Sequence, residues 1–174
     1  MYLGGQSVGK AAVELLYGEK NPSGKLAETW PKKLSDNPAY LNFPGTEGVV
    51  DYAEGVFIGY RYYDKKEMDV SFPFGYGLSY TNFAYSDLRL DRSEMTDQDA
   101  LTVRCKVKNT GSVAGKEVVQ LYVRNAACDT ARPLRELRGF AKVELRPGEE
   151  KEVSFTLSAR AFAYYEEKIH EPAG

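Results

Sequence analysis

The second half of the chain follows a two-residue hydrophobic period. Every second residue from Leu101 to Val107 is apolar, and the residues between them are threonine, arginine or lysine. The same alternation returns in residues 119–123, 143–145 and 153–157. Successive side chains of a β-strand point to opposite faces, so this period indicates strands with one buried face and excludes helices over the same residues.

Turn signals separate these strands. "NTGSVAG" (109–115) and "RPGEE" (146–150) are rich in residues that favour turns. Short alternating strands at this spacing predict a mainly β fold, an antiparallel sandwich of the immunoglobulin or fibronectin type III kind, over residues 83–174. The pattern accounts for five or six strands where about seven are typical. We therefore expect the last strand to be missing and one sheet edge to be exposed.

The first 31 residues follow a different pattern. Apolar residues in 6–17 recur at helical spacing, and Gly18 is placed to end that helix. "KLAETW" (25–30) reads as a short strand closed by Pro31. One helix and one strand cannot bury their apolar faces alone. We interpret residues 1–31 as the C-terminal remnant of a larger α/β sandwich domain.

Residues 32–82, which we call the strap, show no sustained period. Prolines and glycines interrupt the segment, yet aromatic residues are frequent, most densely in "YAEGVFIGYRYYD" (52–64). Disordered segments are poor in aromatic residues, and structureless loops of this length are uncommon inside a compact domain. We therefore predict an aromatic-rich, irregular but ordered segment that lies between domains.

Charge and hydropathy exclude several partners. The formal net charge is −2 at pH 7, and the sequence has no basic stripe of the kind that nucleic acid requires. No apolar run approaches the ~20 residues that cross a bilayer, so no membrane partner is expected. No signal-peptide pattern follows Met1, which favours a cytoplasmic location and leaves secretion of a longer parent open.

We expect no metal, no cofactor and no disulfide bond. Cys105 reads as a small core residue and Cys128 as a loop residue, both with free thiols. If the runs on either side of Val113 formed a hairpin, Cys105 would lie too far from Cys128 to be bridged. A structural zinc site needs about four ligands, and His170 is the one histidine of the sequence.

Six phrases of the sequence together resemble one enzyme family. They are "NPSGKL", "YAEGVFIGYRYYD", "FPFGYGLSY", "NTGSVAGKEVVQLYV", "RPLRELRGFAKVEL" and "PGEEKEVSFTL". In this order and spacing they are similar to the C-terminal region of glycoside hydrolase family 3, the β-glucosidase family, in its thermostable bacterial branch. The resemblance covers nearly the whole chain. It implies a parent with a catalytic barrel, an α/β sandwich domain and a fibronectin type III-like domain, of which the barrel is absent here.

The resemblance also implies a mechanism, the retaining hydrolysis of terminal β-D-glucosyl residues by two carboxylates about 5–5.5 Å apart. The family's nucleophile is the aspartate of a Ser-Asp-Trp motif on the barrel, which Ser35-Asp36-Asn37 and Ser86-Asp87-Leu88 do not match. Its acid/base glutamate lies ahead of the matching residues. We therefore assign no catalytic residue. We expect the chain to be inactive alone, to brace the upstream barrel and α/β domains, and to meet a β-glucoside only through them.

The strap supplies the candidates for a substrate-proximal or domain-interface site, which are Tyr52, Glu54, Tyr60, Arg61 and Tyr62. Tyrosine combines an apolar ring with a hydroxyl group, so it suits both sugar platforms and protein interfaces. We favour the interface, because a likeness of fold does not by itself establish a substrate site.

Glu54 is also a conceivable catalytic carboxylate, with Asp51 or Asp64 as its partner. Such a pair needs a rigid frame that holds one group protonated and the other ionised, and a strap without its supporting domains offers none. The simpler interpretation is that Glu54 caps a turn or pairs with Arg61.

Two flanking motifs are interpreted as packing and docking elements. In "FPFGYGLSY" the glycines allow tight turns, and we expect four rings to be buried against the sandwich, those of Phe72, Phe74, Tyr76 and Tyr80. "RPLRELRGF" carries three arginines that we place on a solvated or docking face, Arg132, Arg135 and Arg138.

Three functions remain open on the sequence alone. The first is a non-catalytic C-terminal fragment of a β-glucosidase. The second is a carbohydrate-binding or adhesion module of the fibronectin type. The third is an independent protein-interaction domain that self-associates through the open edge of the sandwich.

Overall fold

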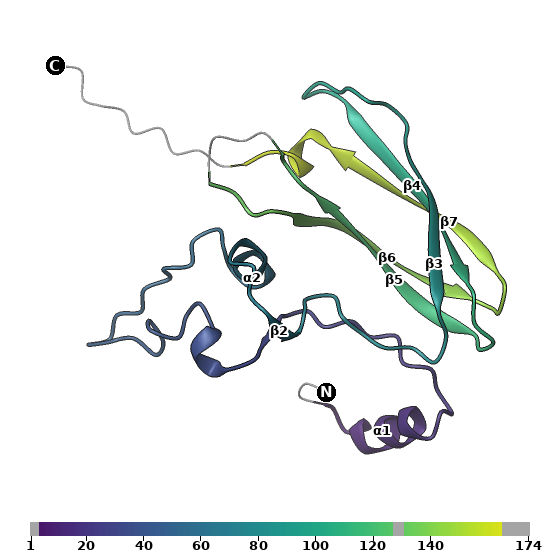
Figure 1. Ribbon diagram of the computed structural model, residues 1–174, viewed down its shortest axis with the longest axis horizontal. Coiled ribbons are helices and arrows are strands. Elements are labelled where there is room, and N and C mark those ends of the chain that lie inside the picture. Colours follow the sequence, from purple (N-terminus) through teal and green to yellow (C-terminus); the bar gives the residue numbers. More distant parts are fainter. Residues whose placement is uncertain (1–3, 127–130, 165–174) are drawn as a thin grey trace.

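The computed structural model describes residues 4–126 and 131–164, and Figure 1 shows a β-sandwich beside an irregular region of short helices and loops. The irregular region contains α1 (Val8–Leu16), β1 (Trp30–Pro31), the 3₁₀ helix η1 (Leu34–Asp36), α2 (Tyr60–Lys65) and β2 (Val70–Phe72). The sandwich contains β3 (Phe83–Leu90), β4 (Ala100–Asn109), β5 (Gly115–Val123), β6 (Glu136–Leu145), β7 (Glu150–Ser158) and the 3₁₀ helix η2 (Ala159–Ala161).

The sandwich consists of two antiparallel sheets. One has the order β3-β4-β7 and the other pairs β5 with β6. The mainly β fold expected from the alternation is confirmed. A hairpin about Val113 is not formed, because β4 pairs with β3 and β7 and the turn after it carries the chain into the other sheet. The chain thereby places both sheets around a single core.

The core lies between the two sheets. Its centre is formed by Val107, Val119, Leu145 and Val153, and half-buried apolar residues such as Phe155 pack around it. Cys105 belongs to this outer layer and is half-buried rather than fully buried. Its thiol is free, as expected. Cys128 and His170 lie outside the described residues.

One buried amide connects the two sheets. The side chain of Asn109, at the end of β4, has no exposed surface. Its Nδ2 donates to the carbonyl oxygens of Val113 (2.8 Å) and Leu145 (3.1 Å). Its Oδ1 accepts from the Thr81 hydroxyl (2.6 Å) and the Gly111 amide (3.0 Å). Both donors and both acceptor positions of the amide are therefore used.

The helix of the irregular region ends as the sequence predicts. Gly18 follows α1 with φ of 77°, a left-handed conformation that glycine adopts without strain. The strand predicted over 25–30 is wrong, since the ladder holds only Trp30 and Pro31, which pair with Phe72 and Val70 of β2. Leu26 exchanges two backbone hydrogen bonds with residues 75–76, but the chain bends directly after it and the ladder is interrupted.

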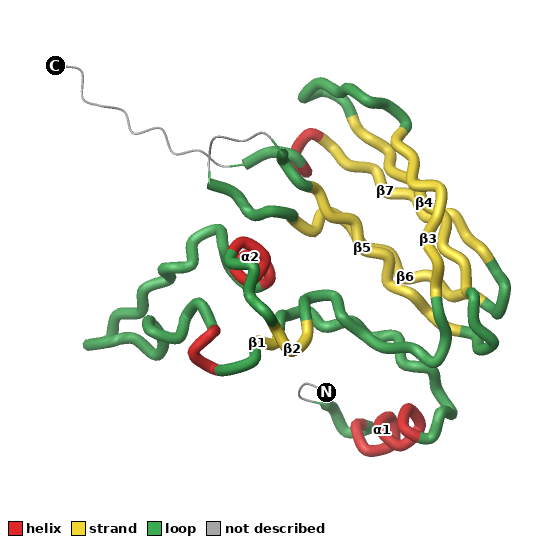
Figure 2. Tube along the Cα trace, viewed as in Figure 1, coloured by secondary structure: helices red, strands yellow, loops and turns green. Residues whose placement is uncertain are grey.

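Figure 2 shows that most of the strap is loop, as the lack of period predicts, but it also contains helix α2. The sequence does not reveal this helix because six residues are too few to display a helical period. The expected burial of four rings is wrong for three of them. Phe74 is half-buried, whereas Phe72, Tyr76 and Tyr80 are exposed. Phe72 packs instead against Trp30 and Tyr76 within the irregular region.

None of the helices in the described part of the chain has the length and apolar character needed to cross a membrane.

Candidate functional site at the seam

The first 82 residues meet the sandwich along a band of polar and aromatic contacts that we call the seam. One side of the seam comprises Lys25, Tyr60, Arg61, Asp64 and Gly75. The other side is formed by residues of β5, β6 and the segment before β6, which are Glu117, Gln120, Tyr122, Arg135, Glu136 and Leu137.

Asp64 and Arg135 form the strongest polar contact of the seam. Arg135 Nε donates to Asp64 Oδ2 (2.7 Å) and Arg135 Nη2 donates to Oδ1 (3.1 Å). This two-point geometry fixes orientation as well as distance. The hydrogen bond from Asp64 raises the already high pKa of Arg135. The guanidinium group also lies 5.4 Å from the ring centre of Tyr122 on β5, so α2 is connected to both sandwich strands.

Tyr60 supplies the aromatic part of the seam. Its ring centre lies 4.8 Å from that of Phe74 and 5.9 Å from that of Tyr122. Its hydroxyl oxygen accepts a hydrogen bond from the backbone N–H of Leu137 (2.8 Å). Burial raises the pKa of Tyr122, whose ring contacts that of Tyr60 almost edge-on. The apolar body and polar tip of Tyr60 are thus both used.

Glu136 collects the arginines of this region. Its Oε2 lies 2.9 Å from Arg132 Nη2 and 3.0 Å from Arg138 Nη2, and its Oε1 lies 3.5 Å from Arg61 Nη2. Arg61 therefore pairs with Glu136 across the seam, and the expected pair between Arg61 and Glu54 is not formed. Helix α2 is the reason, because it carries Arg61 toward β6. The arginine motif thus lies partly within ion pairs rather than on a solvated face.

A second polar cluster joins the αβ remnant to the sandwich. Lys25 Nζ lies 3.1 Å from Glu117 Oε2, with only 16% and 12% of the two side chains exposed. The Tyr85 hydroxyl donates to Glu117 Oε1 (2.9 Å). Burial, followed by the charge of Glu117, raises the pKa of Tyr85. The shared carboxylate ties Lys25 to strands β3 and β5 at once.

Gly75 allows the closest backbone approach of the seam. Its φ is 79°, and a Cβ atom at this position would lie 2.2 Å from Gln120 Oε1. The Gly75 carbonyl accepts a hydrogen bond from Gln120 Nε2 (3.1 Å), while Gln120 Oε1 accepts from the Tyr122 hydroxyl (2.7 Å). Any larger residue would push this loop away from β5.

The structure places the five sequence-derived candidates in different surroundings. Tyr60 and Arg61 contact the sandwich as described, and Tyr62 packs against the buried Tyr63 within α2. Tyr52 is 87% exposed, on the loop that extends away from the sandwich in Figure 1.

The carboxylates of the strap do not form a catalytic pair. Asp64 is held by Arg135. Glu54 begins a turn through its backbone carbonyl, which accepts from Phe57 N–H (2.9 Å). Among the described residues, its carboxylate makes no hydrogen bond or ion pair, and no group of three histidine, cysteine, aspartate or glutamate residues could hold a metal ion.

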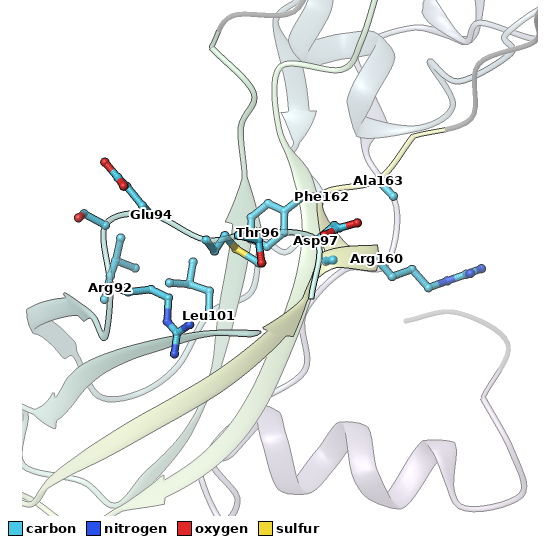
Figure 3. Close-up of a pocket in the computed structure, with 12 residues that line it drawn as sticks. Arg92, Glu94, Thr96, Asp97, Leu101, Arg160, Phe162 and Ala163 are labelled. Atoms are coloured by element: carbon cyan, nitrogen blue, oxygen red, sulfur yellow. The ribbon is translucent and has the colours of Figure 1, made fainter. Parts of the chain in front are cut away.

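A larger hollow lies at the far end of the sandwich, between the loop after β3 and η2. It has a volume of about 640 Å³, and Figure 3 shows Phe162 and Leu101 among the residues that line it. The charged ends of Glu94 and Arg160 point away from Phe162 in this view. The hollow offers apolar surface without converging polar groups, which hydrolysis would require.

Sequence reasoning missed the partners across the seam. Lys25, Glu117 and Glu136 carry no local signal, because each depends on a residue far away in the sequence. The "RPLRELRGF" motif was the nearest indication, since it places arginines at 132, 135 and 138 around Glu136.

Comparison with known proteins identifies related chains over nearly the full length. Residues 1–80 match the family model "Glycosyl hydrolase family 3 C-terminal domain", and residues 117–172 match "Fibronectin type III-like domain". Thermostable beta-glucosidase B of Acetivibrio thermocellus is 58% identical over 98% of the chain, which covers 22% of that protein. An exo-alpha-(1->6)-L-arabinopyranosidase of Bifidobacterium breve is 46% identical over 98% of the chain, again covering 22% of the relative.

The structural comparison agrees. The crystal structure of a GH3 beta-glucosidase from Bifidobacterium adolescentis superposes with a TM-score of 0.87 at 46% identity, over 94% of this chain and 24% of that chain. The chain thus spans less than a quarter of the length of these relatives.

Proposed function

The chain belongs to glycoside hydrolase family 3, and we propose that it is the non-catalytic C-terminal part of a retaining β-glucosidase, in which it braces the upstream barrel and α/β domains. In this proposal residues 1–31 complete the α/β domain, the strap connects it to the sandwich, and residues 83–174 form the fibronectin type III-like domain. The catalytic carboxylates belong to the part of the parent that precedes the matching residues.

The observation that carries the proposal is the apolar surface of the first 82 residues. Helix α1 is amphipathic, yet it buries none of its residues. Leu16 is 80% exposed and Leu41 is 89% exposed. Soluble proteins rarely expose contiguous apolar surface of this kind unless it contacts another element. The upstream domains of a longer parent would cover it, while the seam holds the covered surface to the sandwich.

The relatives support a division of labour between specificity and bracing. One is named a β-glucosidase and another an arabinopyranosidase, although both match this chain over 98% of its length. The same C-terminal region therefore accompanies enzymes named for different sugars. We infer that the choice of sugar and linkage is made outside these 174 residues.

The first test is hydrolysis of an aryl β-glucoside by the chain alone. We expect no turnover above that of a mock preparation, because no carboxylate pair is assembled. Glu54→Gln is the matched variant. Turnover by the chain that disappears in Glu54→Gln would contradict the inactive assignment and place chemistry in the strap.

The second test is complementation. The chain is added to Acetivibrio thermocellus β-glucosidase B from which the matching C-terminal residues have been removed, and the half-life of activity at elevated temperature is followed. Bracing predicts a several-fold longer half-life with the chain present. The double variant Leu16→Glu, Leu41→Glu should lose this effect, whereas Phe140→Glu, on the exposed surface of β6, should retain it.

Cello-oligosaccharide titration separates the remaining alternative. Tyrosine and Trp30 fluorescence of the chain should not change on addition of sugar. Saturable binding by the isolated chain would favour a carbohydrate-binding module instead.

A further inference from the structure

Strand β5 has one edge with no neighbour. It pairs with β6 along its other edge, and no backbone group of residues 115–123 bonds to any further strand in the described part of the chain. Residues 118–123 read "VVQLYV", with no charge, no proline and no glycine. Natural edge strands usually carry such residues, or a bulge, to prevent pairing with other chains. The composition of β5 is that of a strand paired on both sides.

The other edges of the sandwich are protected. A register shift interrupts β3 between Ser86 and Arg89, and Asp87 within it has φ of 53°. On β6, the Leu137 N–H is bonded to Tyr60 and the Glu144 carbonyl to Lys151 Nζ. Strand β7 begins with three charged residues, Glu150, Lys151 and Glu152. The bare edge of β5 is therefore a local feature rather than a general property of these sheets.

An opening into the core lies beside this edge. Its volume is about 500 Å³, and it is bounded by residues 85–88 of β3 and 119–122 of β5. Val103, Cys105 and Phe155, which belong to or surround the core, form its floor. Protein interiors are normally packed without gaps of this size. The opening and the bare edge are adjacent, so one inserted element would satisfy both.

We propose that the free edge of β5 is an acceptor site for a single extended peptide strand with apolar residues at every second position. Its backbone would continue the β5–β6 sheet, and its inward side chains would fill the opening between β5 and β3. This is the β-augmentation mode of recognition, in which backbone hydrogen bonds give affinity and alternate side chains give selectivity.

The geometry favours a single strand over a second copy of the protein. A two-fold pairing of β5 with its counterpart would use the same surface on both copies. Each copy would then bring its own β3 and β4 into the opening, because β3 stands directly across that opening from β5. A lone strand brings no second sheet with it.

The binding test uses the full chain and two synthetic peptides of identical composition. The alternating peptide KTVTVTVTK presents valine on one face, and the control KTTTVVVTK does not. Fluorescence anisotropy of the labelled alternating peptide should show saturable binding at least ten-fold tighter than that of the control. Amide hydrogen exchange should slow in residues 118–123 and stay unchanged in β7. Equal binding of the two peptides, or no slowing in β5, would overturn the proposal.

Variants locate the site. Leu121→Arg places a charge in the opening and should weaken binding at least ten-fold, while Phe140→Arg on β6 should not change it. Ser86→Arg charges the rim of the opening from an exposed position on β3 and gives the same test without touching the core. Unchanged binding in Ser86→Arg would exclude this edge. Sedimentation should show a monomer, and a dimer that dissociates on addition of the peptide would assign the edge to a second copy.

Discussion

The sandwich and the first 82 residues bury their apolar side chains to very different extents. The sandwich closes around a core whose central residues are almost fully buried, such as Val107 and Leu145. In the first 82 residues only Tyr63 is a buried hydrophobic residue, and most of the exposed large apolar side chains of the molecule lie there. One region thus stabilises itself, whereas the other takes its order from what it contacts.

The seam is the part of the molecule where this difference matters. Its contacts are mainly ion pairs and hydrogen bonds around one aromatic cluster. The order of the strap therefore depends on a small number of polar contacts to β5 and β6. Variants on the two sides of the seam should have unequal effects, and the following four measurements are arranged from the largest effect to the smallest.

Asn109→Ala should have the largest effect, because it acts within the self-stabilised region. The substitution leaves the Val113 and Leu145 carbonyls and the Thr81 hydroxyl without their partner inside the sandwich. Each unsatisfied buried group costs about 1 kcal/mol or more, so the free energy of unfolding in urea should fall by about 3 kcal/mol. Asn82→Ala, at an exposed neighbouring position, should change it by less than about 0.5 kcal/mol. Similar effects of the two variants would contradict this account.

Arg135→Met should release the strap while leaving the sandwich folded. It removes the two-point bond to Asp64 and the contact with Tyr122, worth about 1 kcal/mol at this partly exposed position. Trypsin cleavage after Lys65 and Lys66 should accelerate about five-fold, since 1 kcal/mol corresponds to that ratio of open to closed strap. Arg104→Met, an exposed arginine on β4, is the control. An unchanged cleavage rate would mean that the strap is held by other contacts.

Acid should loosen the turn before β7 more gently. The Arg146 backbone N–H donates to Glu149 Oε2 (2.7 Å), which lowers the pKa of Glu149 below its ordinary 4.5. A lowered pKa in the folded state means that the stabilisation is present above pH 4.5 and is lost as the pH falls through the lowered value. The Arg146 amide resonance should shift over this range in NMR spectra. Glu149→Gln should abolish the shift, and a shift that persists would assign it to another group.

Leu16→Glu should have the smallest effect on the isolated chain. Leu16 is 80% exposed on α1, so its replacement should change the free energy of unfolding by less than about 0.5 kcal/mol. A loss above 1 kcal/mol would show that α1 packs within this chain and would remove the contrast between the two regions.

Sequence reasoning succeeded where the pattern is local. The two-residue period of residues 101–107 and 153–157 identifies β4 and β7, since alternation is a property of each strand by itself. Pairing is not local, and the hairpin considered about Val113 was therefore wrong. Helix α2 was missed because it spans less than two turns.

The candidate site was only half accessible from the sequence. Tyr60 and Arg61 stood out because tyrosine and arginine gather in "YAEGVFIGYRYYD". Their partners Glu136 and Leu137 are more than 70 residues away, and nothing in a local pattern connects them. The same distance explains why Arg61 was assigned to the nearer Glu54. Long-range partners of charged residues are set by the fold, which places α2 against β6.

The amide of Asn109 has a consequence for the order of folding. One side chain senses the position of β4, of the turn after it, of β6 and of the residue that leads into β3. A half-formed sandwich with only one sheet in place would bury this group while leaving part of it without partners. Intermediates of that kind are penalised, so the two sheets are driven to close in one cooperative step.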